Sequence, residues 1–213
     1  MIACTTSIGI ALLNQNGADV AYQPAFLGAG EADRAFEALL RQVQFNAPED
    51  SRVHLFGEWH EIPRLQVGYG DQGTSYRFAG CTVRARPWAE VPALMMVRET
   101  LRSRCGFEAN FVLVNLYRSR ANSIGWHQDD EADLGPQPTI LSLSLGAERD
   151  FQFRHRQAAD NGLPTVTIPL APGSLLTMRD PTNKNWKHQV PRRGGTRPER
   201  IGPRLNATWR RIV

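Results

Sequence analysis

The stretch GWHQDDE (125–131), which follows the apolar run FVLVNLY (111–117), is the part of the sequence around which the rest is organised. His127 and Asp129 are two residues apart, and residues i and i+2 of an extended segment point to the same side. Both side chains can therefore meet one metal ion. A third ligand must come from far away in the sequence, and His188 is available.

Two imidazoles and one carboxylate on one face of an ion leave its opposite face open. That is the arrangement of the non-haem Fe(II) oxygenases. A His-x-Asp pair is also common in surface turns, where the Asp caps a backbone N–H. The spacing alone leaves both interpretations open, and the last strand of the chain adds a second observation.

RLNATWR (204–210) alternates between a polar and an apolar face, as a half-buried strand does. Its polar face consists of Arg204, Asn206, Thr208 and Arg210, and in 111–117 Asn115 and Tyr117 likewise share a face. These faces either meet solvent as ordinary amphipathic strands or line a cavity that fits a small dianion.

Geometry favours the cavity. Arg204 and Arg210 are roughly 20 Å apart along the strand, so inward-reaching side chains can approach opposite ends of a dicarboxylate. Forked Arg–carboxylate contacts are strong in a buried pocket. The cosubstrate that combines two carboxylates with an open Fe(II) site is 2-oxoglutarate.

Composition indicates a single domain, 1–213, with a formal net charge of +4. The 25 basic residues include only two lysines, and arginine suits bidentate contact with carboxylate or phosphate, although a codon bias would give the same excess. The 3 cysteines form no Cys-x-x-Cys pair, which indicates a reducing compartment. Residues 1–13 lack a basic start and are too short to span a bilayer, so we expect a cytoplasmic protein without a membrane anchor.

Hydrophobic periodicity predicts helices over 31–43 and 92–105 and short strands over 8–13 and 20–26. From residue 111 onward the pattern predicts strands at 111–117, 124–129, 138–145, 149–155, 164–170, 173–178, 187–190 and 203–212. Many short antiparallel strands after early helices predict an α+β fold: a double-stranded β-helix, or jelly roll, with the N-terminal helices packed on one face.

The stretch 52–80 is rich in aromatic residues, Gly and Arg but lacks the regularity of a core strand. Aromatic residues beside arginines are what a base-stacking surface needs, so we interpret 50–80 as a nucleotide-recognition segment. The alternative is a loop whose aromatic side chains fill a small satellite core.

These motifs together resemble the AlkB family of Fe(II)/2-oxoglutarate nucleic-acid dealkylases. The resemblance runs from about residue 12 to the C-terminus and rests on His127-x-Asp129, His188, the 204–210 pattern and Asn-Leu-Tyr at 115–117. Ile-Pro-Arg at 62–64, Tyr-Gly-Asp at 69–71 and Pro-Thr-Asn at 181–183 are most similar to the branch with the duplex-DNA repair enzyme.

The resemblance implies a role for each matching residue. Iron would be bound by His127, Asp129 and His188, and 2-oxoglutarate by Asn115, Tyr117, Arg204, Asn206, Thr208 and Arg210. The substrate-binding residues would be Phe56, Gly57, Glu58, Arg64, Tyr76, Arg77, Phe78, Asp130 and Glu131. Phe78 would stack on a flipped base, Asp130 and Glu131 would read its edge, and the finger at 55–57 would fill the gap left in the duplex.

The implied activity is oxidative demethylation of N1-methyladenine and N3-methylcytosine in DNA, using O2 and releasing formaldehyde, succinate and CO2. We expect a monomer in the cytoplasm, or in the nucleus of a eukaryote. Glu58 replaces a basic residue and Ala79 replaces a serine of the duplex-specific pattern, which weakens the expectation of strong duplex binding. The alternatives are the same reaction mainly on RNA or single-stranded DNA, a non-catalytic binder of modified nucleic acid, and an oxygenase acting on a protein or small molecule.

Overall fold

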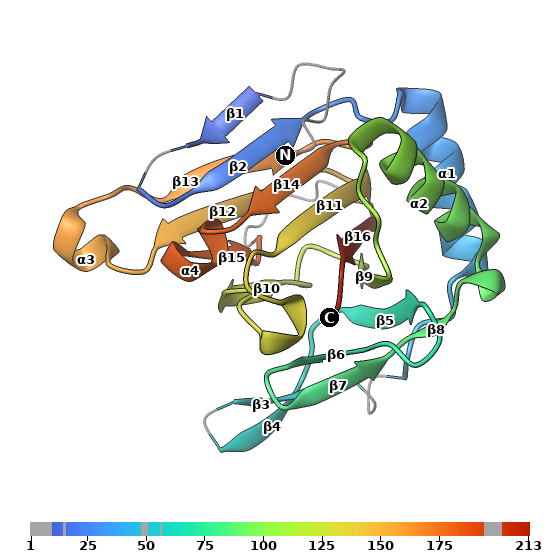
Figure 1. The fold of residues 1–213 in the computed structure, drawn as a ribbon, viewed down its shortest axis with the longest axis horizontal. Coiled ribbons are helices and arrows are strands. Elements are labelled where there is room, and N and C mark those ends of the chain that lie inside the picture. The colour runs from blue at the N-terminus through green and yellow to red at the C-terminus, as the bar shows by residue number, and fades with distance from the viewer. Residues whose placement is uncertain (1–9, 15, 48–50, 56, 194–201) are drawn as a thin grey trace.

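Two β-sheets lie face to face in the computed structural model, which describes residues 10–14, 16–47, 51–55, 57–193 and 202–213 (Figure 1). The 8-stranded sheet has the order β1 (Ile10–Leu13), β2 (Asp19–Gln23), β14 (Leu175–Arg179), β11 (Thr139–Gly146), β16 (Arg204–Arg210), β9 (Phe111–Tyr117), β5 (Leu65–Gly70) and β8 (Arg86–Pro87). The 4-stranded sheet has the order β10 (Ile124–His127), β15 (Trp186–Val190), β12 (Arg149–His155) and β13 (Val166–Leu170).

The strands from β9 to β16 divide between the two sheets in the pattern of a double-stranded β-helix. β9, β11, β14 and β16 belong to the large sheet, and β10, β12, β13 and β15 belong to the small one. The predicted jelly roll is therefore confirmed. The strands predicted at 111–117 and 149–155 coincide with β9 and β12, and the described part of the strand predicted at 8–13 is β1.

Two helices cover the outer face of the large sheet, as predicted: α1 (Ala29–Gln42) and α2 (Pro92–Cys105). They lie side by side in Figure 1. The alternation of β11 explains the layering, because Leu141, Leu143 and Leu145 pack under the helices while Ser142 and Ser144 are buried on the other face. Among the described residues, no helix is long and apolar enough to cross a membrane.

The other elements are short. They are the helices α3 (Ala158–Asn161) and α4 (Thr182–Asn185), the 3-10 helices η2 (Trp88–Glu90) and η3 (Ala132–Leu134), and two hairpins, β3 (Arg52–Leu55) with β4 (Glu58–Glu61) and β6 (Ser75–Phe78) with β7 (Cys81–Arg84). In Figure 1 both hairpins lie below β5, on the side of the molecule that also carries β10.

The stretch 52–80 is more regular than its sequence indicated, and the expectation that it holds no core strand is wrong. β5 is fully integrated in the large sheet, where it pairs antiparallel with β9. Val67 and Tyr69 pack into the core under the helices, but the inward face carries Gln66, Gly68 and Gly70. The usual alternation is hidden because glycine takes the place of apolar side chains where the β6–β7 hairpin approaches.

Gly68 lies at the closest point of that approach. A Cβ atom there would be 2.7 Å from Cγ1 of Val83 and 2.8 Å from Cζ of Phe111, both of them buried. We expect Gly68→Ala to lower the free energy of unfolding by about 1–3 kcal/mol, the usual cost of overpacking a core. Chemical denaturation would measure this, with Gly202→Ala, which meets nothing within 4 Å, as the control. Equal stability of the two variants would contradict this packing.

Candidate active site

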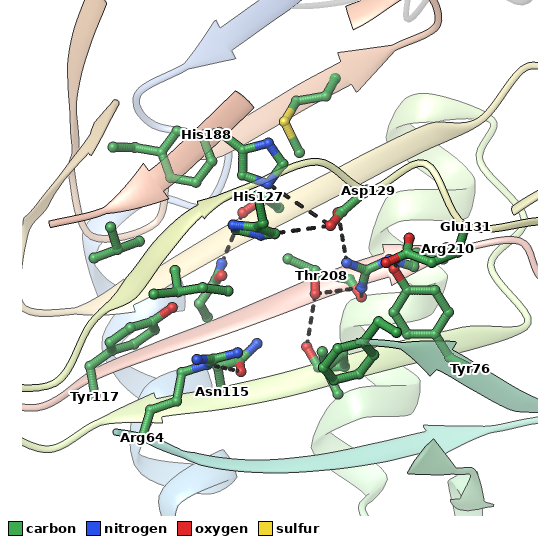
Figure 2. A pocket seen from close by; sticks show the side chains of 18 residues that line it. Arg64, Tyr76, Asn115, Tyr117, His127, Asp129, Glu131, His188, Thr208 and Arg210 are labelled. Carbon is green, nitrogen blue, oxygen red and sulfur yellow. Dashed lines mark hydrogen bonds and ion pairs between the residues drawn. The ribbon is translucent and has the colours of Figure 1, made fainter. Parts of the chain in front are cut away.

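A cavity opens between the two sheets and contains most of the residues singled out from the sequence (Figure 2). It measures about 580 Å³ with its open mouth included. Its lining residues are Arg64, Tyr76, Phe78, Leu113, Asn115, Tyr117, Ile124, His127, Asp129, Glu131, Ser142, Phe151, Met178, His188, Val190, Asn206, Thr208 and Arg210.

His127, Asp129 and His188 converge at the centre of this cavity, as Figure 2 shows. His127 ends β10 and is paired in register with His188 of β15, which brings together residues far apart in the sequence. Oδ1 of Asp129 lies 3.7 Å from Nε2 of His127 and 3.9 Å from Nε2 of His188. The three ligand atoms lie within 4.8 Å of one another, close enough to share one metal ion.

The protonation states of Asp129 and the two histidines favour the binding of a metal cation between them. Burial alone would raise the pKa of Asp129, but the guanidinium of Arg210 and the two imidazoles outweigh it and lower the pKa to about 2. Burial, together with the nearby ring of His127, lowers the pKa of His188 to about 3. Burial also lowers the pKa of His127, so at neutral pH the cluster is one carboxylate and two neutral imidazoles, the forms that bind metal ions.

A hydrogen bond also orients His127. Its Nδ1 lies 2.8 Å from the backbone carbonyl of Gly125, so Nδ1 carries the proton and Nε2 is free to face a metal. The donor set and its geometry fit Fe(II) with an open coordination position.

Arg210 contacts both a metal ligand, Asp129, and the aromatic ring of Tyr76. Its Nη2 donates to Oδ2 of Asp129 at 2.9 Å, and its Nη1 donates to Oγ1 of Thr208 at 2.7 Å. The guanidinium carbon lies 4.7 Å from the ring centre of Tyr76. Arg210 is thus fixed beside the metal site, where it can also meet a carboxylate bound to the metal.

Arg204, at the other end of β16, is fully buried. Its Nη2 donates to Oγ of Ser144 at 2.9 Å, while Nε and Nη1 have no acceptor among the described side chains and backbone. Buried guanidinium N–H groups are costly to leave without partners. A ligand carboxylate is the natural acceptor for them, which fits one end of 2-oxoglutarate.

The remaining predicted cosubstrate residues lie between these two arginines. Asn206 donates through Nδ2 to Oγ of Ser142 and to the carbonyl of Leu143, both at 2.9 Å, so it is tied to β11. Asn115 accepts a hydrogen bond from Nε of Arg64 at 2.8 Å. Arg64 was predicted to contact the nucleotide, but the structure places it beside Asn115 and Tyr117, toward the end of the cavity away from Tyr76 (Figure 2).

Tyr76, Phe78 and Glu131 form the opposite end of the cavity. Tyr76 and Phe78 lie on one face of β6 with ring centres 5.3 Å apart. The Tyr76 hydroxyl donates to Oε2 of Glu131 at 2.6 Å. Burial, followed by the charge of Asp129, raises the pKa of Glu131 to about 7. Aromatic rings beside a half-buried carboxyl group can stack on a base and bond to its edge.

Several predicted substrate residues do not line the cavity. Arg77 points outward from β6 and pairs with Asp133 at 2.6 Å. Asp130 is exposed, unlike its neighbour Glu131. Gly57 and Glu58 are exposed at the turn of the β3–β4 hairpin, and Phe56 lies outside the described residues.

Sequence reasoning missed other lining residues. Phe151, Met178 and Ser142 also line the cavity, but the sequence identifies them only as parts of predicted strands. Alternation within 149–155 places Phe151 on the inward face and could have indicated it. The ring of Phe151 stacks on His188 with centres 5.2 Å apart. Phe151 thus forms an apolar wall beside the metal ligands, a position that no sequence motif indicated.

Comparisons with known proteins agree with this site. The model of the 2OG-Fe(II) oxygenase superfamily matches residues 19–210. The human protein "DNA oxidative demethylase ALKBH2" is 40% identical over 205 residues, which cover 94% of this chain and 76% of the relative. The cattle protein "Alpha-ketoglutarate-dependent dioxygenase alkB homolog 3" is 36% identical over 195 residues, with 89% and 64% covered.

The solved structure of OsALKBH1 has the same fold, with a TM-score of 0.55 at 18% identity over 93% of this chain and 99% of that one. The sequence matches extend over the strands that carry the metal ligands, Arg204 and Arg210. The chain therefore belongs to the 2OG-Fe(II) oxygenase superfamily, whose members use Fe(II) and 2-oxoglutarate, and within it to the AlkB family.

Proposed function

We propose that this chain demethylates N1-methyladenine and N3-methylcytosine in DNA as an Fe(II)- and 2-oxoglutarate-dependent dioxygenase. One observation carries the proposal: a single cavity is lined both by the metal-binding triad and by Tyr76, Phe78 and Glu131. A base that enters between these side chains presents its Watson–Crick edge, and hence its N-methyl group, toward the metal ligands. The 40% identity to a DNA oxidative demethylase supports the same substrate class.

In the proposed reaction, one set of residues holds iron and another binds 2-oxoglutarate. His127, Asp129 and His188 would hold iron, while Arg210 and Arg204 would bind the two carboxylates of 2-oxoglutarate. With O2, the bound iron and 2-oxoglutarate supply the oxidation that hydroxylates the N-methyl group and yields succinate and CO2. The hydroxymethyl group then leaves the base as formaldehyde.

Base selection follows from charge and stacking. N1-methyladenine and N3-methylcytosine are cationic, so the carboxyl group of Glu131 favours them over normal bases. Phe78 and Tyr76 offer ring faces on which a flipped base can stack. A methylated base that cannot pair also costs less to flip, since unstacking is worth only a few kcal/mol.

We further propose that the chain acts as a monomer with O2 as oxidant, in the cytoplasm or, in a eukaryote, the nucleus. Residues 1–213 would form one catalytic domain, in which 50–80 is the nucleotide-recognition segment. Tyr76 and Phe78 of this segment line the cavity from β6, which supports the assignment, whereas no described residue of the β3–β4 hairpin lines it.

Assays on matched oligonucleotides test the function. The purified protein, Fe(II) and 2-oxoglutarate would be incubated with one methylated base in single-stranded DNA, duplex DNA and RNA, and loss of the methyl group followed by mass spectrometry. Demethylation of either DNA supports the proposal, whereas faster demethylation of RNA would favour the RNA alternative. Binding without demethylation, or 2-oxoglutarate turnover with no nucleic acid substrate, would contradict it.

A substitution of Phe56 would test whether the protein is adapted to duplex or to single-stranded DNA. An apolar wedge can fill the hole that a flipped base leaves in a duplex, and a single strand has no such hole. Because stacking an aromatic ring on a base is worth about 1–3 kcal/mol, we expect Phe56→Ala to slow repair of methylated duplex at least about tenfold. Single-strand repair should stay within a few-fold. Equal losses on both substrates would show that Phe56 is packing or general binding surface.

A further inference from the structure

Arg149 is a buried arginine that is neither a proposed metal ligand nor a predicted contact of 2-oxoglutarate or the substrate. It begins β12 on the inward face of the small sheet and is 1% exposed. Its Nη2 donates to the carbonyls of Asn122 and Pro191, both at 2.9 Å, and its Nη1 donates to the carbonyl of Ser119 at 3.3 Å. The guanidinium thus connects the turn between β9 and β10 with the residue that follows β15.

The same guanidinium lies against Tyr117, a predicted cosubstrate residue. The guanidinium carbon of Arg149 is 5.6 Å from the ring centre of Tyr117, and that of Arg204 is 5.1 Å from it. Arg204 is the register partner of Tyr117 in the large sheet, whereas Arg149 comes from the opposing sheet. One aromatic ring therefore contacts a cation from each sheet, and both contacts restrict its orientation.

Arg149 and Arg204 form no ion pair with any carboxylate in the described part of the chain, although the more distant charge of Asp150 acts on Arg149. Burial lowers the pKa of Arg204 to about 10, and the positive charge of Arg149 contributes to that shift. Arg149 and Arg204 do not themselves line the cavity but lie behind Tyr117, which does. Two buried positive charges at this position are offset best by an anionic group bound in the cavity, because charges interact strongly where water is excluded.

We propose that Arg149 is a positioning residue for 2-oxoglutarate: it holds Tyr117 against Arg204 and supplies a second positive charge that favours a dicarboxylate over a monocarboxylate 2-oxo acid. This inference rests on the proposed function, in which Arg204 binds one carboxylate. The competing explanation is purely structural, namely that Arg149 only ties three backbone carbonyls together.

Ligand affinity in the absence of turnover separates the two explanations. Titration calorimetry on the Mn(II)-loaded protein would measure the Kd of 2-oxoglutarate and of 2-oxovalerate, which lacks the second carboxylate. Arg149→Gln keeps hydrogen-bond donors for the carbonyls but removes the charge. We expect it to weaken 2-oxoglutarate roughly tenfold, the size of one charge interaction across a partly shielded pocket, and to leave 2-oxovalerate within about twofold.

Two further variants complete the test. Arg149→Lys keeps the charge but loses carbonyl contacts, so it should retain the preference for 2-oxoglutarate. Arg193→Gln is the matched control, because this guanidinium is already neutralised by Asp150 at 2.9 Å, and it should change neither affinity. Thermal unfolding of each variant would show whether the fold is intact. If Arg149→Gln does not fold, Arg149→Lys decides the matter through its Kd for 2-oxoglutarate. A Kd within about twofold of the wild-type value supports the charge, whereas equal weakening of both ligands through the lost carbonyl contacts supports the purely structural explanation.

The possible outcomes are distinct. Equal weakening of both ligands in Arg149→Gln, unchanged affinity for both, or loss of the preference in Arg149→Lys would each overturn the inference. Failure of the wild-type protein to bind 2-oxoglutarate would instead overturn the proposed function. Wild-type binding without demethylation of any oligonucleotide would leave the role of Arg149 standing while the DNA assignment fails.

Discussion

Asp129→Ala is expected to reduce succinate formation more than about a hundredfold, because loss of even an outer partner of a metal ligand costs 10–100-fold. The carboxylate is the one anionic ligand of the triad, and Arg210 is bonded to it at 2.9 Å. Its removal leaves two neutral imidazoles and an arginine that repels a cation. Succinate release and the metal content of the purified protein would both be measured, and both should fall.

The control for this variant is Asp160→Ala, which removes an exposed carboxylate from α3, far along the chain from the metal ligands. Its turnover and metal content should equal those of the unaltered protein. If Asp129→Ala kept its metal and its turnover, the assignment of His127, Asp129 and His188 as the iron ligands would have to be abandoned.

Arg204→Met should raise the KM for 2-oxoglutarate by at least about a hundredfold, since two hydrogen bonds between charged groups contribute roughly 1.5–3 kcal/mol each. Methionine fills much of the buried volume, so packing changes little while Nε and Nη1, the donors without acceptors, are removed. DNA affinity and its dependence on salt should not change. Initial rates at varied 2-oxoglutarate and salt titrations of DNA binding would provide both measurements.

Arg179→Met is a suitable comparison for Arg204→Met. Arg179 lies at the end of β14 and pairs with Asp19 at 3.1 Å on a partly exposed surface, so its loss should leave the KM for 2-oxoglutarate unchanged. A weaker and less salt-dependent DNA affinity in Arg204→Met, at an unchanged KM, would identify Arg204 as a phosphate contact instead.

The strands and ligands that follow residue 111 were predictable because their patterns are local. Alternation in 204–210 places Arg204 and Arg210 on one face, and in the structure both are buried between the sheets. Spacing alone puts His127 and Asp129 on one side of an extended segment. The pairing of β10 with β15 then brings in His188, a long-range contact that periodicity cannot show but the motif combination implied.

The features that escaped prediction depend on contacts between distant segments. β5 was not recognised because Gly68 and Gly70 replace apolar residues where the neighbouring hairpin packs closely. The hydrogen bond from Arg64 to Asn115 joins residues 51 positions apart, so the sequence around Arg64 gave no sign of it. Arg149 was one arginine among many, and only the facing sheets reveal that it contacts Tyr117.

In the proposed reaction, one cavity brings a methylated base to the residues that would hold iron and 2-oxoglutarate. The most direct measurement is the stoichiometry of a single reaction on DNA with one N3-methylcytosine, in which repaired cytosine, formaldehyde and succinate are counted together. The account predicts one formaldehyde for each repaired base, with succinate formed in at least equal amount and no repair when 2-oxoglutarate is omitted. Repair without formaldehyde, or succinate that does not rise when the methylated DNA is added, would contradict it.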